Sequence, residues 1–321
     1  MTDRARRAAA IALRLLVVLI SAVALRYQLA GLDRAQIAAA FRRYDGSQIA
    51  PAVLCTAASF ATLGLVELLA LRYAERGGPR IIPRRSALAT AFVAHAFSQS
   101  VGFGLLTGAA VRLRAYARYN VDAETVARTS IFVSGTTLLG LFSLGSIALL
   151  TTPGFSRLVW TRVAAASIGA AMAVLVIAYL AWCSLGSDTG IGIGRWRFAP
   201  PSPSIAAAQM LLAIVDWLVT GTVLFLLVPH GTFVPFAGFL AAYLLAHAAG
   251  IASHVPAGTG VFEATFIALI APGSVSPERA GLVASLLAYR VLYYALPLCA
   301  AAALAMLSEL SRQRRRSRNE S

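Results

Sequence analysis

Long apolar stretches recur along almost the whole 321-residue chain, and they limit what it can fold into. A helix crosses the bilayer core with about 20 apolar residues, and several of these stretches reach that length. Because lipid offers no hydrogen-bond partners, a crossing segment must satisfy its own backbone groups, which favours helices. Hydrophobic residues make up 59% of the chain and charged residues 13%, so we predict an all-α polytopic membrane protein, with residues 1–321 forming one integral membrane domain. The stretches lie near 8–30, 49–71, 87–106, 126–150, 159–183, 204–228, 235–253, 256–271 and 279–308.

The basic residues predict how the chain is oriented. All of them are arginine, and most gather in the N-terminal tail and at 72–86, 112–118, 195–197 and 312–318. Because loops rich in basic residues stay in the cytoplasm, we place these segments and both termini there. This pattern also accounts for the net charge of +15. We expect no nucleic-acid partner, because the chain has no basic stripe interleaved with aromatic residues.

Two regions cannot simply cross the membrane in this orientation. The run 87–106 has basic segments on both sides, so we predict that it dips in and returns as a re-entrant hairpin over 87–119. A cytoplasmic C-terminal tail requires 235–271 to enter and leave from outside, which predicts a second re-entrant hairpin from the opposite face. The remaining six runs are predicted to span the membrane.

A shift of 152 residues places most of these apolar runs on one another. The segment AHAFSQSVGFGLLTG then aligns with AHAAGIASHVPAGTG, and His95 meets His247. Each half, 1–152 and 153–321, therefore has three spanning helices and one re-entrant hairpin. Because that is an odd number of crossings, the two halves must be inverted relative to each other, an architecture typical of transporters.

Small residues and a proline interrupt both predicted hairpins. Glycine permits tight reversals, and proline lacks an amide donor, so a helix is broken where they occur. A new helix after each break would direct its positive N-terminal end toward the membrane centre, where an anion such as phosphate would bind. The alternative is that these glycines only allow close helix packing. The breaks are Gly102 and Gly104, then Pro256 and Gly258; the expected helix starts are Ala109, after Thr107 and Gly108, and Val261, after Thr259 and Gly260.

Charged residues within the apolar runs are costly, and each is therefore a candidate for function. Arg112 and Glu263 each follow one of the breaks, so we hypothesise that they face one central cavity and bind opposite charges on a lipid head group. Asp216 would join Glu263 in binding an amine. The alternative is a purely structural ion pair of Glu263 with Arg112 or Arg290. The full predicted substrate-binding set is Arg112, Glu263, Asp216, Arg290, His254, Thr107, Gly108, Thr259 and Gly260.

The remaining features predict no catalytic or cofactor chemistry. Cys55, Cys183 and Cys299 each lie in an apolar run without CxxC spacing, and the histidines lack enough acidic or thiol neighbours, so we expect no metal site and no cofactor. The glycine-rich segment 189–198 follows no strand and is predicted to be a linker between the halves. Glu67 is expected to face the cytoplasmic interface.

Two segments, TGAAVRLRAY at 107–116 and SHVPAGTGVFEA at 253–264, resemble the signature segments of the lysylphosphatidylglycerol synthase transmembrane-region family. The similarity is greatest to the flippase half of the multiple peptide resistance factor proteins. It implies an integral protein of the bacterial inner membrane that moves lipid between leaflets, with Arg112 and Glu263 in its site. Those proteins continue into a soluble aminoacyl-transferase domain, whereas this chain ends at Ser321, so we expect that it cannot make the lipid itself.

The leading functional prediction is therefore a non-enzymatic flippase for a phospholipid, including an aminoacylated one, or for a polyprenyl-type lipid. The alternative from another class is a membrane-embedded partner that anchors or regulates a separate lipid-modifying enzyme. An intramembrane enzyme is disfavoured because no nucleophile and base can be recognised in the sequence. An open lateral groove lined by charged residues would favour the flippase.

Overall fold

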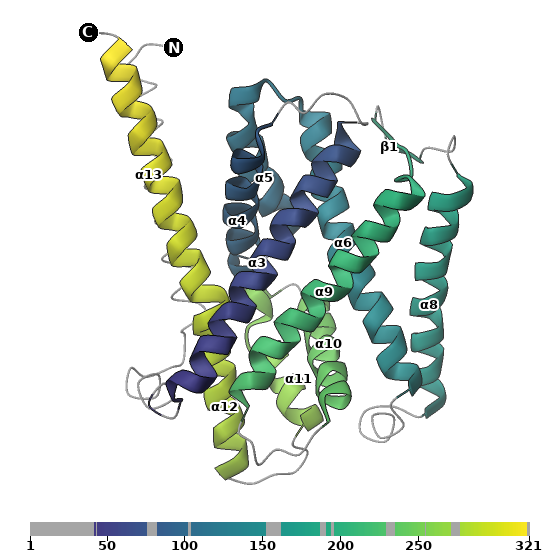
Figure 1. Cartoon of the computed structure of the whole chain (residues 1–321). Helices are drawn as coiled ribbons and strands as arrows, with labels where there is room; N and C mark the ends of the chain where they lie inside the picture. Colours follow the sequence, from purple (N-terminus) through teal and green to yellow (C-terminus); the bar gives the residue numbers. More distant parts are fainter. Residues whose placement is uncertain are drawn as a thin grey trace.

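The computed structural model describes residues 42, 44–75, 82–101, 104–151, 162–186, 191–193, 196–228, 235–253, 255–270 and 277–319. In these ranges the chain is a bundle of helices with one short pair of strands (Figure 1). The first predicted span, 8–30, lies outside the described residues. The elements are α3 (Gly46–Ala74), α4 (Arg84–Val101), α5 (Gly104–Tyr116), η1 (Ala117–Tyr119), α6 (Ala123–Thr151), α8 (Arg162–Leu185), β1 (Ile191–Ile193), β2 (Trp196–Phe198), α9 (Pro203–Leu227), α10 (Phe236–Ala252), η2 (Pro256–Gly258), α11 (Val261–Ile270), α12 (Pro277–Tyr289), η3 (Arg290–Ala295) and α13 (Leu296–Asn319).

Five helical segments are long and apolar enough to cross a membrane, which confirms a multi-pass, all-α membrane protein. They correspond to α3, α6, α8, α9 and the continuous rod formed by α12, the π-helical turn η3 and the first part of α13. The linker expected at 189–198 contains the antiparallel strands β1 and β2, with Ile191 opposite Phe198. This pair was not expected from the sequence.

Two pairs of short helices form hairpins within the bundle. Helices α4 and α5 pack together, and so do α10 and α11, which have only 17 and 10 residues. Figure 1 shows the first hairpin toward one end of the bundle and the second toward the other. When shifted by 152 residues, Arg84 at the start of α4 falls on Phe236 at the start of α10. The inverted relation of the halves 1–152 and 153–321 nevertheless stays a prediction.

The break in the second hairpin lies at the predicted glycines. Backbone φ is positive at Ala257, Gly258 and Gly260, with values of 54°, 61° and 83°. A Cβ at Gly258 would lie 3.1 Å from Cα of Gly250 on α10, so glycine also permits the two arms to approach closely. Helix α11 then begins at Val261, as predicted.

The break in the first hairpin lies earlier than predicted. Helix α5 begins at Gly104, not at Ala109, so Thr107 and Gly108 lie inside it. Leu105 and Leu106 are strong helix formers, which explains why the helix includes them and does not begin after Thr107. Gly102 lies outside the described residues.

Helix α6 is closely packed against α9 at one glycine. A Cβ on Gly140 would lie 2.5 Å from Cδ1 of Trp217 and 2.7 Å from the carbonyl oxygen of Ala213, both on α9. The Trp217 indole also donates to the carbonyl of Thr137 at 2.9 Å. At its start, α6 is capped by Asp122, whose carboxylate accepts from the Thr125 amide at 3.1 Å; hydrogen bonding to Thr125 lowers the pKa of Asp122.

We predict that Gly140→Ala destabilises the protein by about 1–3 kcal/mol, because the added methyl group would clash with both the buried Trp217 ring and the backbone of Ala213. Gly135→Ala on the same helix is the matched control, since a Cβ there meets nothing within 4 Å. Thermal unfolding in detergent measures both. Equal melting temperatures for the two variants would contradict this packing.

The positions of the helix ends generate a topology prediction. In Figure 1 the C-terminal ends of α3, α5, α8 and α13 lie at one end of the bundle, and those of α6, α9 and α11 at the other. In a cysteine-free background, we expect Ser47→Cys and Ala117→Cys, both at exposed positions, to react with an impermeant thiol reagent from opposite sides of the membrane. Ala117→Cys should react from the cytoplasm. Labelling of both from one side would refute the arrangement.

Candidate functional site

A cavity of about 440 Å³ lies where the two helical hairpins meet. Every helix of both hairpins contributes to its wall, together with α3, α6, α9 and the π-helical turn η3. The lining is apolar with embedded polar groups, a composition typical of small-molecule sites. The polar side chains in the wall are His95, Ser98, Gln99, Arg112, Ser134, Thr137, Asp216, Trp217, Thr220, Tyr243, His247, Tyr293 and Tyr294.

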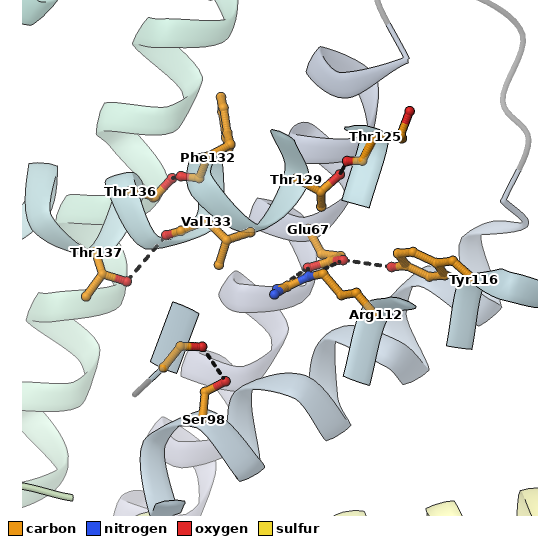
Figure 2. Close-up of polar contacts among 11 residues, drawn as sticks. Glu67, Ser98, Arg112, Tyr116, Thr125, Thr129, Phe132, Val133, Thr136 and Thr137 are labelled. Atoms are coloured by element: carbon orange, nitrogen blue, oxygen red, sulfur yellow. Dashed lines mark hydrogen bonds and ion pairs between the residues drawn. The ribbon is translucent and has the colours of Figure 1, made fainter. Parts of the chain in front are cut away.

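Arg112 reaches this cavity from α5 while held by a carboxylate behind it. Its Nε lies 2.9 and 3.0 Å from the two carboxylate oxygens of Glu67 on α3, and its Nη2 lies 2.6 Å from Oε2 (Figure 2). The Tyr116 hydroxyl donates to Oε1 of Glu67 at 2.7 Å. The side chains of Arg112 and Glu67 are 4% and 0% exposed, so the pair is fully withdrawn from solvent. The expectation that Glu67 faces the interface is wrong.

Gly108 provides the space in which Arg112 folds back along its own helix. A Cβ at Gly108 would lie 2.8 Å from Nη1 of Arg112 and 3.0 Å from Oγ of Ser98 on α4. Both polar atoms therefore lie within 3.0 Å of one point. The role predicted for Gly108 as the start of a helix is replaced by this steric role.

Asp216 lines the cavity from α9 and pairs with no basic side chain among the described residues. The Ser59 hydroxyl, on α3, donates to its Oδ1 at 2.6 Å. The same hydroxyl lies 3.0 Å from the hydroxyl of Tyr293, which in turn lies 3.5 Å from Nε2 of Gln99. This chain of polar contacts links α9, α3, η3 and α4 across the centre of the bundle.

An aromatic wall faces the cavity beside Asp216. Rings of Trp217 and His247 have centroids 5.2 Å apart, and His247 lies 4.4 Å from both Tyr243 and Phe262. The Tyr243 hydroxyl is 2.7 Å from the hydroxyl of Tyr289, so the wall is fixed by hydrogen bonds as well as packing. Aromatic faces beside a carboxylate favour a cationic group.

Glu263 and Arg290 bind each other and stay outside the cavity lining. Nε of Arg290 contacts Oε1 of Glu263, and its Nη atoms lie 3.4 and 3.5 Å from the carbonyl of Ala257 in the break. Oε2 of Glu263 accepts from the Gly260 amide at 2.7 Å, which is the glutamate half of a capping box at the start of α11. Of the two open interpretations, the structural ion pair with Arg290 agrees with these contacts.

The structure therefore brings only part of the predicted set together. Arg112 and Asp216 share the cavity, with Gly104 and Gly258 in its wall, whereas Glu263 and Arg290 hold the second break. Thr107 and Thr259 are half-buried and are not among the lining residues; Gly260 lies at the helix cap, also outside the lining. His254 lies outside the described residues.

Several lining or supporting residues were not predicted from the sequence. Ser59, Gln99 and Tyr293 give no motif, and they become visible only when four helices meet. Glu67 did give a signal, because a lone carboxylate in an apolar run has to find a partner. In the described part of the chain, His, Cys, Asp and Glu side chains form no group of three suited to a metal ion.

The mouth of the cavity carries exposed apolar side chains. Leu105 on α5, Leu138 on α6 and Ile251 on α10 line the cavity and are 43%, 41% and 46% exposed. In a membrane protein such side chains face lipid, so the cavity with its embedded polar groups has an apolar rim.

We predict that Arg112→Gln and Glu67→Gln each destabilise the protein by about 3–5 kcal/mol, because each leaves a buried charge without its partner. The double variant should recover much of this loss. Chemical unfolding in detergent measures all three, with Arg114→Gln, an exposed arginine on the same helix, as the control. Losses that simply add in the double variant would contradict the pairing.

Comparison with known proteins agrees with this architecture. Residues 11–301 match the family model described as the lysylphosphatidylglycerol synthase transmembrane region. The uncharacterised protein slr0712 of Synechocystis is 35% identical over 234 residues, which cover 72% of this chain and 71% of that protein. The inner membrane protein YbhN of Escherichia coli is 30% identical over 283 residues, covering 87% and 86%. A phosphatidylglycerol lysyltransferase of Staphylococcus haemolyticus is 23% identical over 287 residues, covering 88% of this chain but only 32% of that protein. The chain belongs to the lysylphosphatidylglycerol synthase transmembrane-region family.

Proposed function

We propose that this protein moves a lipid with a charged head group between the leaflets of the bacterial inner membrane. The observation that carries the proposal is the cavity between the two hairpins, which has charged and polar groups within a mainly apolar lining and an apolar, exposed rim. A lipid has the same division, with a polar head group and apolar chains. The head group would enter the cavity while the chains stay between Leu105, Leu138 and Ile251.

The charges in the wall favour a head group that carries both signs. Arg112 and Asp216 line the same cavity, and only Arg112 has a partner of opposite charge. Since the Arg112–Glu67 pair is neutral overall, the ionised Asp216 would leave the empty site negative. A phosphate near Arg112 and an amine near Asp216 and the aromatic wall would satisfy both groups. A phospholipid, including an aminoacylated one, fits this arrangement. A polyprenyl phosphate would use only the phosphate position near Arg112.

The relatives support the class of lipid and the location. The name phosphatidylglycerol lysyltransferase refers to an anionic phospholipid, and the inner membrane protein of Escherichia coli is matched along most of its length. We propose the same membrane for this chain, with the arginine-rich end of the bundle and both termini in the cytoplasm. A transporter without catalytic groups accounts for the site, which we propose as non-enzymatic.

A second proposal is that the chain anchors a separate lipid-modifying enzyme. Helix α13 continues to Asn319, well beyond Leu307 where its membrane-compatible part ends, and Figure 1 shows it projecting past the rest of the bundle. Such a projection suits contact with another protein. The two proposals differ in one respect, because an anchor does not need to translocate lipid by itself.

The decisive experiment is leaflet-resolved lipid transfer in proteoliposomes that contain phosphatidylglycerol, phosphatidylethanolamine or an aminoacylated phosphatidylglycerol. For amine-bearing lipids, we expect Asp216→Asn to lower the rate by about tenfold or more, because a charge-assisted hydrogen bond to the amine is lost. An impermeant amine reagent reports how much lipid has reached the outer leaflet.

Asp122→Asn is the matched control, because it changes a carboxylate outside the cavity and asparagine caps a helix as well as aspartate. Its transfer rate should equal that of the wild type. If wild-type proteoliposomes transfer no lipid faster than empty liposomes, transport is refuted and the anchoring role is favoured.

A further inference from the structure

Two of the three buried polar atoms on α4 that have no hydrogen-bond partner among the described residues belong to side chains that line the cavity. They are Nε2 of His95 and Oε1 of Gln99. His95 is only 7% exposed. Buried polar groups are almost always satisfied, because an unsatisfied one loses its hydrogen bonds to water without replacing them. A pair of such atoms four residues apart on one helix face therefore points to a ligand that satisfies them.

Arg112 offers a third free position in the same wall. Its Nε and Nη2 are used by Glu67, whereas Nη1 has no hydrogen-bond partner among the described residues. Gly108 keeps Nη1 and the Ser98 hydroxyl within 3.0 Å of a common point, a space that any larger residue would fill. The cavity thus has a recess with an arginine donor on one side and α4 on the other.

The free groups of this recess are hydrogen-bond donors, whereas the Ser98 hydroxyl already donates to the carbonyl of Gly104 at 3.1 Å. The guanidinium donates only, and the imidazole donates from one nitrogen when neutral. Rotating the Gln99 amide by 180° exchanges its nitrogen and oxygen, so that the NH2 takes the unpartnered position and the oxygen accepts from Tyr293, whose single hydroxyl proton then points to Gln99 instead of Ser59. Helix α5 also begins in this wall, at Gly104, which adds the positive end of a helix.

We infer that His95 and Gln99 of α4, together with Nη1 of Arg112, form an anion subsite that receives the phosphate group of the ligand. The inference rests on the proposed function only for the source of that phosphate, which is then a lipid head group. Asp216 lies on a different helix, α9, so an amine on the same head group would be directed to a separate part of the cavity. His95 and Gln99 are the specificity residues for the phosphate.

The test measures equilibrium binding to the purified full chain in detergent through the increase in melting temperature with added ligand. The probes are phosphatidylglycerol, an uncharged galactosyl diacylglycerol with the same acyl chains, and inorganic phosphate. We expect phosphatidylglycerol to bind the wild type at least tenfold more tightly than the galactolipid. His95→Phe and Gln99→Leu should each weaken its binding by about tenfold, the effect of losing one hydrogen bond to a charged group.

Ser100→Ala is the matched control. Ser100 lies on the same helix, is equally buried and has an unpartnered hydroxyl, but it does not line the cavity. Its phosphatidylglycerol affinity should equal that of the wild type. His95→Gln retains an N–H donor and should keep most of the affinity, which separates the loss of a donor from a disturbed fold. Melting temperatures without ligand check that each variant is folded.

Inorganic phosphate distinguishes the two sources of the anion. Competition by phosphate in the millimolar range supports the subsite with a soluble anion as its ligand, whereas binding of the lipid alone supports the head group. Equal affinities of the wild type for phosphatidylglycerol and the galactolipid overturn the inference, as does an unchanged affinity in folded His95→Phe/Gln99→Leu. Loss of binding in that variant, in a protein that transfers no lipid, would leave the subsite standing and refute only the transport function.

Discussion

The structure depends on enclosing two interruptions of the backbone within protein. A helix that stops inside a bilayer exposes amide and carbonyl groups that lipid cannot satisfy. Here an arginine–glutamate pair ties each hairpin to the bundle. The hairpin supplies the arginine in one pair and the glutamate in the other. In the first hairpin Arg112 on α5 reaches Glu67 on α3, and in the second Glu263 on α11 receives Arg290 from η3. The cavity lies between the two hairpins that these pairs tie to the bundle.

This arrangement assigns different tasks to charges that look alike in the sequence. Glu263 is occupied by its own helix and by Arg290, so the positive end of α11 is already compensated. Among the described residues, the Asp216 carboxylate has the Ser59 hydroxyl as its one hydrogen-bond partner, and it lines the cavity. Arg112 both holds a hairpin and lines the cavity. Its Nε and Nη2 bind Glu67, and Nη1 is left without a partner among the described residues. Under the proposed function, structure and recognition meet in one side chain, and its substitution would disturb both.

The sequence predicted the class of fold and the second break, but not the partners. Pro256, Gly258 and Gly260 have few conformational alternatives, so their break and the start of α11 followed from residue type alone. The start of α5 was wrong because leucines extended the helix to Gly104. The pairing of Arg112 with Glu67 could not be chosen over Glu263, since it depends on which helix faces which. Apolar runs without strong periodicity carry no such information.

The π-helical turn at Arg290–Ala295 has a consequence for how this last helical rod is built. A wide turn accommodates one residue more than an α-helical turn and changes the direction of side chains along the rod. Deleting one residue from it would restore ordinary winding and rotate everything that follows by about 100° relative to Arg290. Tyr293 and Tyr294, which both line the cavity, would then point away from it. The number of residues in this turn thus determines the direction in which the tyrosines of the aromatic wall point. A deletion there is therefore far more damaging than a substitution.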